Sequence, residues 1–434
     1  MTEGQSPVPV AWEALRYGPW EGVVLPRQPP SEKVRKDRGL PRSVRPVEDD
    51  GVSQQPVFDP ALAEYPRALR PSEPAFADPR LAERWFAARR EALDTVLSAV
   101  AASRWAEHLV LRGSVLLRAW YGEQAREPGD LDFVVHPADW KLEDRRTDRL
   151  FRELAAGAER LSGTVRLHAG EAVSDEIWTY DRVPGRRLVL PWTAPGVPGG
   201  TVQLDFVFTE RLPVPARRCE LPGVTGQLLA ATPELSLAWK LLWLVTDTHA
   251  QGKDLYDAVL LARTVEVSYD LLRDVFAQSD ASLRLRSLLP RDLTRLDVDW
   301  EEFAKDYPRF AEPAEEYLAE LVALLHPTFA EHGEYALRAR WLGPLTEELR
   351  QVLARSGMGA VQEWLFRRYL LPDDALVVTN ELLDGDLAAA HRTVAERFAD
   401  GREARLPRLA EAAARYAAEL ADGPRAGDGG DGGS

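Results

Sequence analysis

Apolar residues recur along the chain with two periodicities, which divide it into a mixed α/β part and a long helical part. Residues 79–102 have the three- and four-residue apolar spacing of a helix, and several later runs alternate as strands do. After Pro233 the helical spacing continues to about residue 420. The elements expected before Pro233 are a helix over 79–102, a strand over 109–111, a helix over 115–121, a strand with Asp130 and Asp132, a helix over about 138–161, strands near 165–167, 176–180 and 187–190, a turn at "GVPGG" and the strand "TVQLDFVF". This order predicts a compact α/β domain with a mixed sheet, followed by a helical C-terminal region.

A chain of 434 residues is too long for one ordinary hydrophobic core, so two or three domains are expected. Its start is rich in proline and charge, with few sustained periodic runs, and it ends in "GPRAGDGGDGGS". The expected segments are a loosely structured, partly disordered extension over 1–78, an α/β domain over 79–232, a helical part over 233–330 that completes the active site, an additional helical domain over 331–422 and a flexible tail over 423–434.

Asp130 and Asp132 lie one residue apart in an apolar run, so they share one face of the expected strand. Like charges on one face repel each other, and a divalent cation between them is the usual compensation. Asp205 is a third acid inside an apolar strand. If the three converge, they form a site for one or two Mg²⁺ ions; otherwise Asp205 is an edge-strand acid that faces water.

Gly113 and Ser114 stand between an expected strand and a helix, where glycine permits close backbone approach and the first helical amides bind phosphate oxygens. The same pair is also a common turn and N-cap. Lys240 is the only charge in the middle of the helix "TPELSLAWKLLWLVTD" and one of six lysines in the chain. An ammonium in so apolar a helix either opens onto a cleft and contacts phosphate or extends its end to water.

Asp254 and Asp257 lie three residues apart at the start of the helix in "GKDLYDAVLLAR". This spacing predicts a capping box, in which Asp254 caps and Asp257 bonds back to its amide. It is equally compatible with one of the two acids lying in the cleft beside Lys240.

Composition narrows the class of protein. A formal net charge of −15 argues against nonspecific coating of nucleic acid, although arginine pairs such as Arg186–Arg187 leave room for a local basic groove. Cys219 is the only cysteine, which excludes a disulfide framework and a multi-cysteine zinc site. With no signal-like start and no long uncharged apolar run, a cytoplasmic protein without membrane contact is expected.

The order Gly-Ser turn, Asp-x-Asp strand and later strand acid resembles the polymerase-β-like nucleotidyltransferase fold. The strings "LVLRGSVLLRAWYGEQAREPGDLDFVV", "PELSLAWKLLWLVTD" and "KDLYDAVLLAR" resemble more specifically the AbiEii/AbiGii toxin family of nucleotidyltransferases, over roughly residues 80–330. The resemblance implies phosphate binding by Gly113, Ser114 and Arg126, metal binding by Asp130, Asp132 and Asp205, and catalytic roles for these acids, for Lys240 on the triphosphate and for Asp254.

What the resemblance implies is Mg²⁺-dependent transfer of a nucleoside monophosphate from an NTP to the 3′ end of tRNA, by the toxin of an AbiE-type toxin–antitoxin pair used in phage defence. An antitoxin protein is then an expected partner. Arg112 departs from the pattern, because many relatives have a glycine there. Two alternatives stay open: an enzyme of the same fold with a small-molecule or protein acceptor, and an inactive binding module of this fold.

Overall fold

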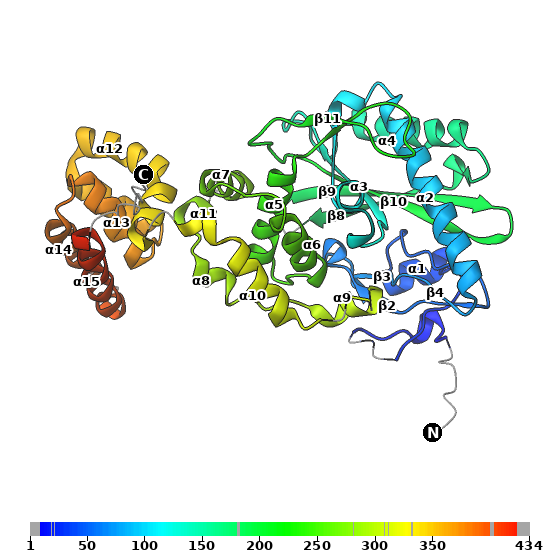
Figure 1. Cartoon of the computed structure of the whole chain (residues 1–434), viewed down its shortest axis with the longest axis horizontal. Coiled ribbons are helices and arrows are strands. Elements are labelled where there is room, and N and C mark those ends of the chain that lie inside the picture. Colours follow the sequence, from blue (N-terminus) through cyan, green and yellow to red (C-terminus); the bar gives the residue numbers. More distant parts are fainter. Residues whose placement is uncertain are drawn as a thin grey trace, which may run out of the picture. The chain divides into compact units, whose positions relative to one another are not determined.

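The computed structural model describes residues 9–18, 20, 22–179, 183–280, 282–307, 309–310, 312–330, 333–399 and 403–422. The chain forms two compact units (Figure 1). Unit 1 comprises Met1–Val265 and Asp297–Tyr317, and unit 2 comprises Glu266–Leu296 and Leu318–Ser434. The units therefore interleave in sequence, whereas the composition placed boundaries at residues 232/233 and 330/331. The functional segments that those boundaries delimit remain a prediction.

Unit 1 is built on a curled mixed sheet with the strand order β11-β12-β5-β6-β10-β9-β7, in which β8 also pairs with β9. Its strands are β5 (Leu109–Arg112), β6 (Asp130–Val135), β7 (Arg166–Leu167), β8 (Val173–Thr179), β9 (Val183–Ala194), β10 (Val197–Val207), β11 (Arg217–Cys219) and β12 (Leu228–Ala230). The pairs β6–β10 and β5–β12 are parallel, and the other pairs are antiparallel. The predicted mixed α/β class is confirmed.

The two faces of the sheet differ in polarity because side chains alternate along each strand. On one face, Phe133 of β6 stacks on Phe206 of β10 with ring centroids 5.5 Å apart, and Phe206 contacts Phe151 at 4.9 Å. Phe151 belongs to α4 (Arg145–Leu161), which packs against α2 (Pro79–Ala101). This face buries the core, and the opposite face carries the acids of β6 and β10.

The remaining helices of unit 1 are α1 (Glu32–Arg38), α3 (Ser114–Tyr121), α5 (Pro233–Thr246), α6 (Gly252–Ala262) and α9 (Trp300–Asp306). α5 begins as its sequence predicts: the Thr232 side chain accepts a hydrogen bond from the Leu235 amide, and Pro233 takes the first helical position. Every residue of α5 from Leu235 to Leu244 is buried, and α5 packs along α6. Lys240 is thus a buried lysine.

Residues 22–78, hereafter the N-terminal segment, are folded, contrary to the loosely structured extension expected for 1–78. They form α1 and two small antiparallel sheets, β1 (Val52–Ser53) with β4 (Ala75–Phe76) and β2 (Pro56–Phe58) with β3 (Leu69–Pro71). Leu25, Leu40 and Leu69 are at most 2% exposed within one cluster. Strands of two or three residues show too little alternation to be detected from sequence.

The hairpin between β9 and β10 also differs from the expectation. The turn lies at Pro195–Gly196, where Gly196 has φ +72°, so only the first glycine of "GVPGG" belongs to it. The other four residues, Val197–Gly200, already belong to β10. Gly200 tolerates a strand position because the Trp192 ring fills its side-chain space: a Cβ there would lie 2.5 Å from Trp192 Cζ2. The helix expected over 138–161 begins only at Arg145, with Asp144 as its N-cap.

Unit 2 is helical over its described residues, as expected for the chain after Pro233. Its helices are α7 (Tyr269–Ser279), α8 (Pro290–Leu293), α11 (His326–Ala330), α12 (Glu334–Arg367), α13 (Pro372–Leu382), α14 (Leu387–Ala399) and α15 (Leu406–Asp422), together with most of α10 (Ala314–Leu324), which starts in unit 1. α12 is interrupted at Gly357, whose φ is +75°.

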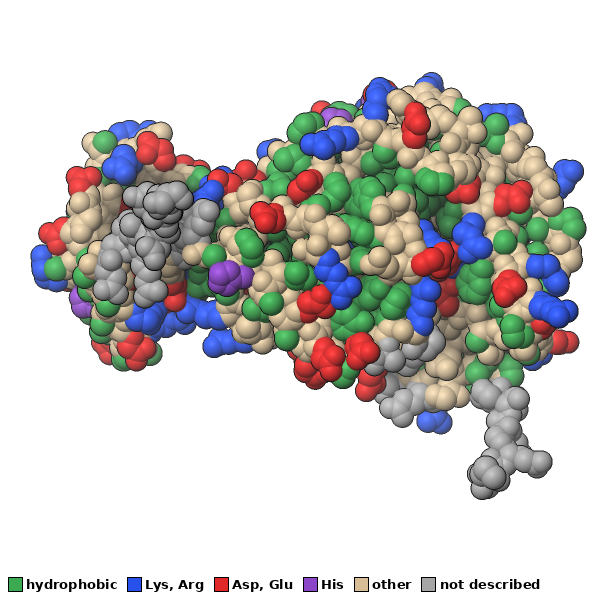
Figure 2. All heavy atoms as spheres, in the orientation of Figure 1, with side chains coloured by type: hydrophobic (Ala, Val, Ile, Leu, Met, Phe, Trp, Pro, Cys, Tyr) green, Lys and Arg blue, Asp and Glu red, His purple; other side chains and the backbone are tan. Residues whose placement is uncertain are grey.

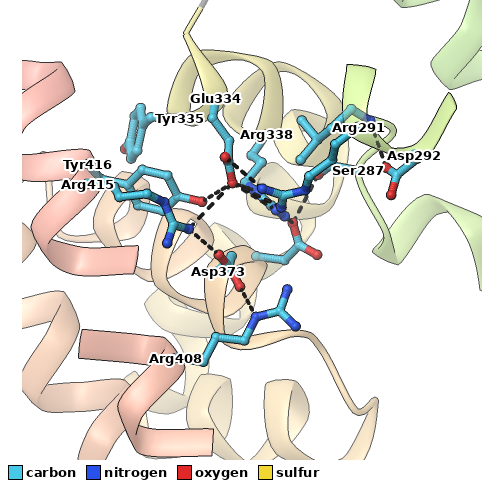
Figure 3. Close-up of polar contacts among 12 residues, drawn as sticks. Ser287, Arg291, Asp292, Glu334, Tyr335, Arg338, Asp373, Arg408, Arg415 and Tyr416 are labelled. Carbon is cyan, nitrogen blue, oxygen red and sulfur yellow. Dashed lines mark hydrogen bonds and ion pairs between the residues drawn. The ribbon is translucent and has the colours of Figure 1, made fainter. Parts of the chain in front are cut away.

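A network of charged side chains, buried at Arg338, Asp373 and Asp374, joins the helices of unit 2 (Figure 3). Arg338 of α12 forms an ion pair with Asp374 of α13, and Ser287 donates a 3.0 Å hydrogen bond to the same carboxylate. Arg408 and Arg415 of α15 bind the neighbouring Asp373 at 2.8 and 2.7 Å. Burial raises the pKa of Asp374 despite Arg338, so this carboxylate depends on its partner to stay ionised.

We expect Arg338→Met to destabilise unit 2 by about 3–5 kcal/mol, because it leaves Asp374 as an unpaired buried charge. Asp374→Leu added to Arg338→Met should recover most of that loss, since the desolvated charge is then gone. Calorimetric unfolding of the full chain measures both. Arg284→Met, which breaks an exposed pair with Glu348, is the matched control and should cost under about 1 kcal/mol. A double variant no more stable than the single one contradicts the assignment.

Candidate active site

Three carboxylates converge where β6 and β10 run side by side. Their parallel register sets Asp205 opposite Asp132 and Gln203 opposite Asp130. One carboxylate oxygen each of Asp130, Asp132 and Asp205 lies within 4.8 Å of the others, as the sequence predicted for a metal site. Oxygen donors so close together fit a divalent cation such as Mg²⁺, which takes carboxylate ligands.

The charges around the three acids support the same interpretation. Burial and repulsion from Asp130 and Asp205 raise the pKa of Asp132 to about 7. Burial also acts against ionisation of Asp130, but Lys253, Arg126 and Arg187 hold its pKa below its ordinary value. A bound cation would relieve the repulsion that Asp132 experiences.

The Gly113–Ser114 turn lies directly against this acid triad. Gly113 has φ +83°, and a Cβ at this position would lie 2.3 Å from Asp132 Oδ2, so only glycine allows this approach. Ser114 begins α3, and its Oγ lies 3.5 Å from Asp130 Oδ1. The first amides of α3 therefore start beside the metal-binding carboxylates, where a phosphate that bridges both is bound most favourably.

Arg112, the departure from the family pattern, lies opposite Asp132 at the end of β5 and has a partner of its own. It forms a 2.8 Å ion pair with Glu210, and its guanidinium lies over the rings of Trp239 and Trp243 of α5 at 5.2 and 5.1 Å. Where many relatives have a glycine, this arginine therefore fills space between the sheet and α5.

Lys240 is held by the two acids of α6. Its Nζ lies 2.7 Å from Asp254 Oδ1 and 2.9 Å from Asp257 Oδ2, and Asp257 also binds Arg126 at 3.1 Å. Burial disfavours the ammonium, but Asp254 and Asp257 raise the pKa of Lys240 above its ordinary value. The capping box is absent, because Gln251 is the N-cap and makes no side-chain cap bond. In this structure, Lys240 therefore binds carboxylates instead of lying free for the predicted phosphate contact.

Asp205 is held by an arginine that is shared with the N-terminal segment. Arg187 of β9 donates to both Asp205 oxygens at 2.9 Å and to Asp59 Oδ2 at 2.6 Å. All three residues are less than 9% exposed. Burial raises the pKa of Asp205 in spite of Arg187, which acts in the opposite direction. Asp205 can therefore exchange a proton more readily than an exposed aspartate at neutral pH.

A cavity of about 610 Å³ opens beside the triad. Asp130 and Arg126 are the predicted site residues that line it. The others are not among its lining residues, namely Gly113, Ser114, Asp132, Asp205, Lys240 and Asp254. The cavity is also lined by two residues that sequence reasoning did not assign to the site, Lys253 and Arg187. Lys253 directly precedes Asp254 in a chain with six lysines, and that rarity was a usable signal.

Comparison with known proteins identifies the type of site. A family model described as "Nucleotidyl transferase AbiEii toxin, Type IV TA system" matches residues 95–331, more than half of the chain. The search of curated proteins found no match to this chain. The matched range contains the triad, the Gly113–Ser114 turn, Lys240 and Asp254, and it excludes the N-terminal segment. Among the described helices, none is both long and apolar enough to cross a membrane.

We expect Asp132→Asn to stabilise the metal-free protein at pH 8. The folded-state pKa of about 7 exceeds that of an unfolded aspartate, so folding favours the protonated carboxyl and stability falls as pH rises from about 4 to 7. The asparagine removes this penalty, which raises Tm by about 2–4 °C per kcal/mol gained.

Thermal shift measurements with EDTA and with Mg²⁺, at pH 5.5 and 8, check this prediction. The gain from Asp132→Asn should shrink at pH 5.5, and the Mg²⁺-dependent rise in Tm should be weaker than in wild type. Asp139→Asn alters an exposed acid and should change neither quantity. If metal-free Asp132→Asn has a lower Tm than wild type at pH 8, repulsion of Asp132 by Asp130 and Asp205 does not destabilise the protein.

We expect Lys240→Met to destabilise unit 1 by about 3–5 kcal/mol, because Asp254 and Asp257 would lose a buried counter-charge. Urea unfolding of the full chain measures the loss. Lys253→Met is the matched control, since it removes a lysine for which the described residues offer no ion-pair partner. If Lys240→Met and Lys253→Met are equally stable, Lys240 does not anchor α6.

Proposed function

The chain belongs to the AbiEii family of nucleotidyl transferase toxins of type IV toxin–antitoxin systems, and we propose that it transfers a nucleoside monophosphate from an NTP to the 3′ end of tRNA. One observation carries the reaction type: three strand carboxylates converge beside a glycine–serine turn that opens a helix. The convergence disfavours the inactive binding module. The family implies an NTP substrate and an antitoxin partner.

The proposed reaction is an in-line displacement at the α-phosphorus. The acceptor hydroxyl oxygen forms the new bond to phosphorus, the bond to pyrophosphate breaks, and the hydroxyl proton passes to Asp205. The amides at the start of α3 and the Ser114 hydroxyl bind the leaving phosphates. Mg²⁺ held by Asp130, Asp132 and Asp205 would neutralise charge on the attacking and leaving oxygens. Lys253 and Arg126, which line the cavity, stabilise the charge that remains.

Lys240 has a positioning role in this proposal. It fixes Asp254 and Asp257, and Asp257 in turn holds Arg126 against the cavity. Loss of Lys240 would therefore act on substrate through Arg126 even without a direct phosphate contact. A direct contact would require the ammonium to leave one of its two carboxylates.

The surface of the molecule bears on the acceptor. Basic and acidic side chains lie interspersed over the face in Figure 2, without a broad field of one sign. With a net charge of −15, this surface favours binding of a short RNA end over coating of a long duplex. The cavity volume lies within the range of about 300–1,000 Å³ found for small-molecule sites, so a small nucleotide or metabolite as acceptor is the second candidate.

The reaction is tested with purified protein, Mg²⁺, each α-³²P-labelled NTP in turn and total tRNA. Wild type should label RNA with one NTP or a subset, while Asp130→Asn and Lys253→Ala should lose at least about 100-fold in rate, because each removes charge stabilisation at the reacting phosphate. Asp139→Asn is the matched control and should retain wild-type labelling.

Each outcome has a distinct meaning. Label in a small molecule or protein, but not in RNA, keeps the nucleotidyltransferase and rejects the tRNA acceptor. Label in RNA that persists in Asp130→Asn rejects the assigned metal site. With total cell extract as acceptor, the absence of label for every NTP rejects the proposed reaction.

A further inference from the structure

The sheet order separates the two sides of the reaction. β6, which carries Asp130 and Asp132, lies between β5 and β10. The chain leaves β5 into the Gly113–Ser114 turn, so the proposed binding site of the leaving phosphates lies on the β5 side. In an in-line displacement the attacking oxygen approaches opposite the leaving group. The acceptor must therefore arrive from the β10–β9 side.

The cavity reaches from Asp130 to that acceptor side. Gln203 and Thr201 of β10 line it, and alternation places both on the same face as Asp205. Asp205 follows Thr201 by four positions, which corresponds to about 13 Å along the strand. From β9, Arg187 and Pro191 lie opposite Asp205 and Thr201 and line the same space. The cavity thus extends away from the acids along the two strands on which the acceptor must lie.

The N-terminal segment forms one wall of this cavity, although it lies outside the residues that match the family. The lining includes eight of its polar or aromatic residues, Ser43, Arg45, Glu48, Gln54, Phe58, Arg70, Ser72 and Glu73. In Figure 1, β2, β3 and β4 of this segment lie beside the sheet, near α9. An AbiEii domain without this segment would leave the acceptor side of the cavity open.

Charged contacts lock this wall onto three different parts of unit 1. Asp59 binds Arg187 of β9 at 2.6 Å, and Arg70 binds Asp306 at the end of α9 at 2.7 Å. Glu73 binds Arg89 of α2 at 2.8 Å. Asp59, Arg187 and Arg89 are each less than 9% exposed. Such buried pairs hold a fixed position, so the segment is a permanent wall of the cavity.

The wall contains hydrogen-bonding capacity that the protein itself does not use. Arg45 lines the cavity, and the described residues provide no partner for its guanidinium. Ser43 Oγ and, from α2 and β9, Trp85 Nε1 and Trp192 Nε1 are buried without a hydrogen-bond partner among the described residues, and all three residues line the same cavity. Unused buried polar groups call for a ligand with acceptor atoms. An unpaired arginine beside them calls for an anion.

We propose that the N-terminal segment is the acceptor-binding wall of the active site, and that Arg45 and Ser43 hold the phosphate of an unpaired terminal nucleotide whose hydroxyl points to Asp205. This inference rests on the proposed function for the direction of attack. The closed wall admits one flexible nucleotide and excludes a base-paired end. A free nucleotide has the same chemistry as an RNA terminus, and the test separates these two sources.

The test measures equilibrium binding of a fluorescein-labelled single-stranded RNA that ends in CCA and has a 3′-deoxy terminus, so that no transfer occurs. For the full-length protein, Arg45→Ala should weaken binding about tenfold and reduce the slope of log Kd against log salt by about 0.7, the loss of one phosphate contact on a single strand. Arg42→Ala is the matched control. Arg42 is exposed on the same segment and does not line the cavity.

Several results would overturn the proposal. Equal binding by wild type and Arg45→Ala does so, as do equal losses in Arg45→Ala and Arg42→Ala. An RNA with the same end base-paired should bind at least tenfold more weakly, and equal binding rejects the closed wall. Free AMP and CMP serve as competitors. Displacement of the RNA assigns the pocket to small nucleotides as well, and failure to displace it assigns the pocket to an RNA end.

This test and the labelling test can fail separately, because the binding needs neither NTP nor transfer. Arg45-dependent binding without any labelling rejects the proposed reaction but supports the N-terminal segment as an RNA-binding wall. Labelling of RNA that is unchanged in Arg45→Ala at subsaturating acceptor keeps the reaction and rejects the wall. In Arg45→Ala, the KM for the NTP should stay at the wild-type value while that for RNA rises.

Discussion

The parallel pairing of β6 with β10 is the constraint on which the rest of the site depends. It forces Asp132 and Asp205 into directly opposite positions, although their charges repel each other. The register cannot relax, because a slip of one residue would turn Phe133 or Phe206 out of the core and an acid into it. Packing of Phe133, Phe206 and Phe151 thus maintains a charge cluster that electrostatics alone would disperse. A fold that keeps such repulsion can use it to bind a cation.

The surrounding cations are themselves restrained, and this keeps the triad negative. Arg187 divides its guanidinium between Asp205 and Asp59, and Arg126 binds Asp257. Within the described residues, Asp130 and Asp132 form no ion pair. Charges therefore alternate outward from the triad, and each cation lowers the repulsion without neutralising the two acids of β6. Asp59 is notable here, because a residue outside the matched family range limits how far Arg187 neutralises Asp205.

Sequence reasoning was sufficient where a local rule decides the outcome. Alternation placed Asp130 and Asp132 on one face, and cap chemistry placed the start of α5 at Thr232 and Pro233. It was insufficient where a tertiary contact decides. The spacing of Asp254 and Asp257 left a capping box and a position beside Lys240 equally open. Packing of α5 on α6 decides between them by bringing Lys240 against both acids. Likewise "GVPGG" contains the residues of a turn, but the ring of Trp192 favours glycine inside a strand.

The N-terminal segment shows the same limit on a larger scale. Its proline content and short strands resemble an unstructured extension. Its order comes from an apolar cluster of distant residues and from ion pairs to Arg187, Asp306 and Arg89, which sequence alone does not bring together. In the proposed enzyme, binding of the leaving group and binding of the acceptor therefore fall to different parts of the chain. The glycine–serine turn binds the leaving group with backbone groups that the reaction itself constrains. The acceptor side is built from side chains of a segment that the chemistry does not constrain. In the proposed enzyme, acceptor choice would therefore change by substitutions at wall residues such as Arg45 and Ser43, whereas Asp59 would have to stay because it shares Arg187 with Asp205.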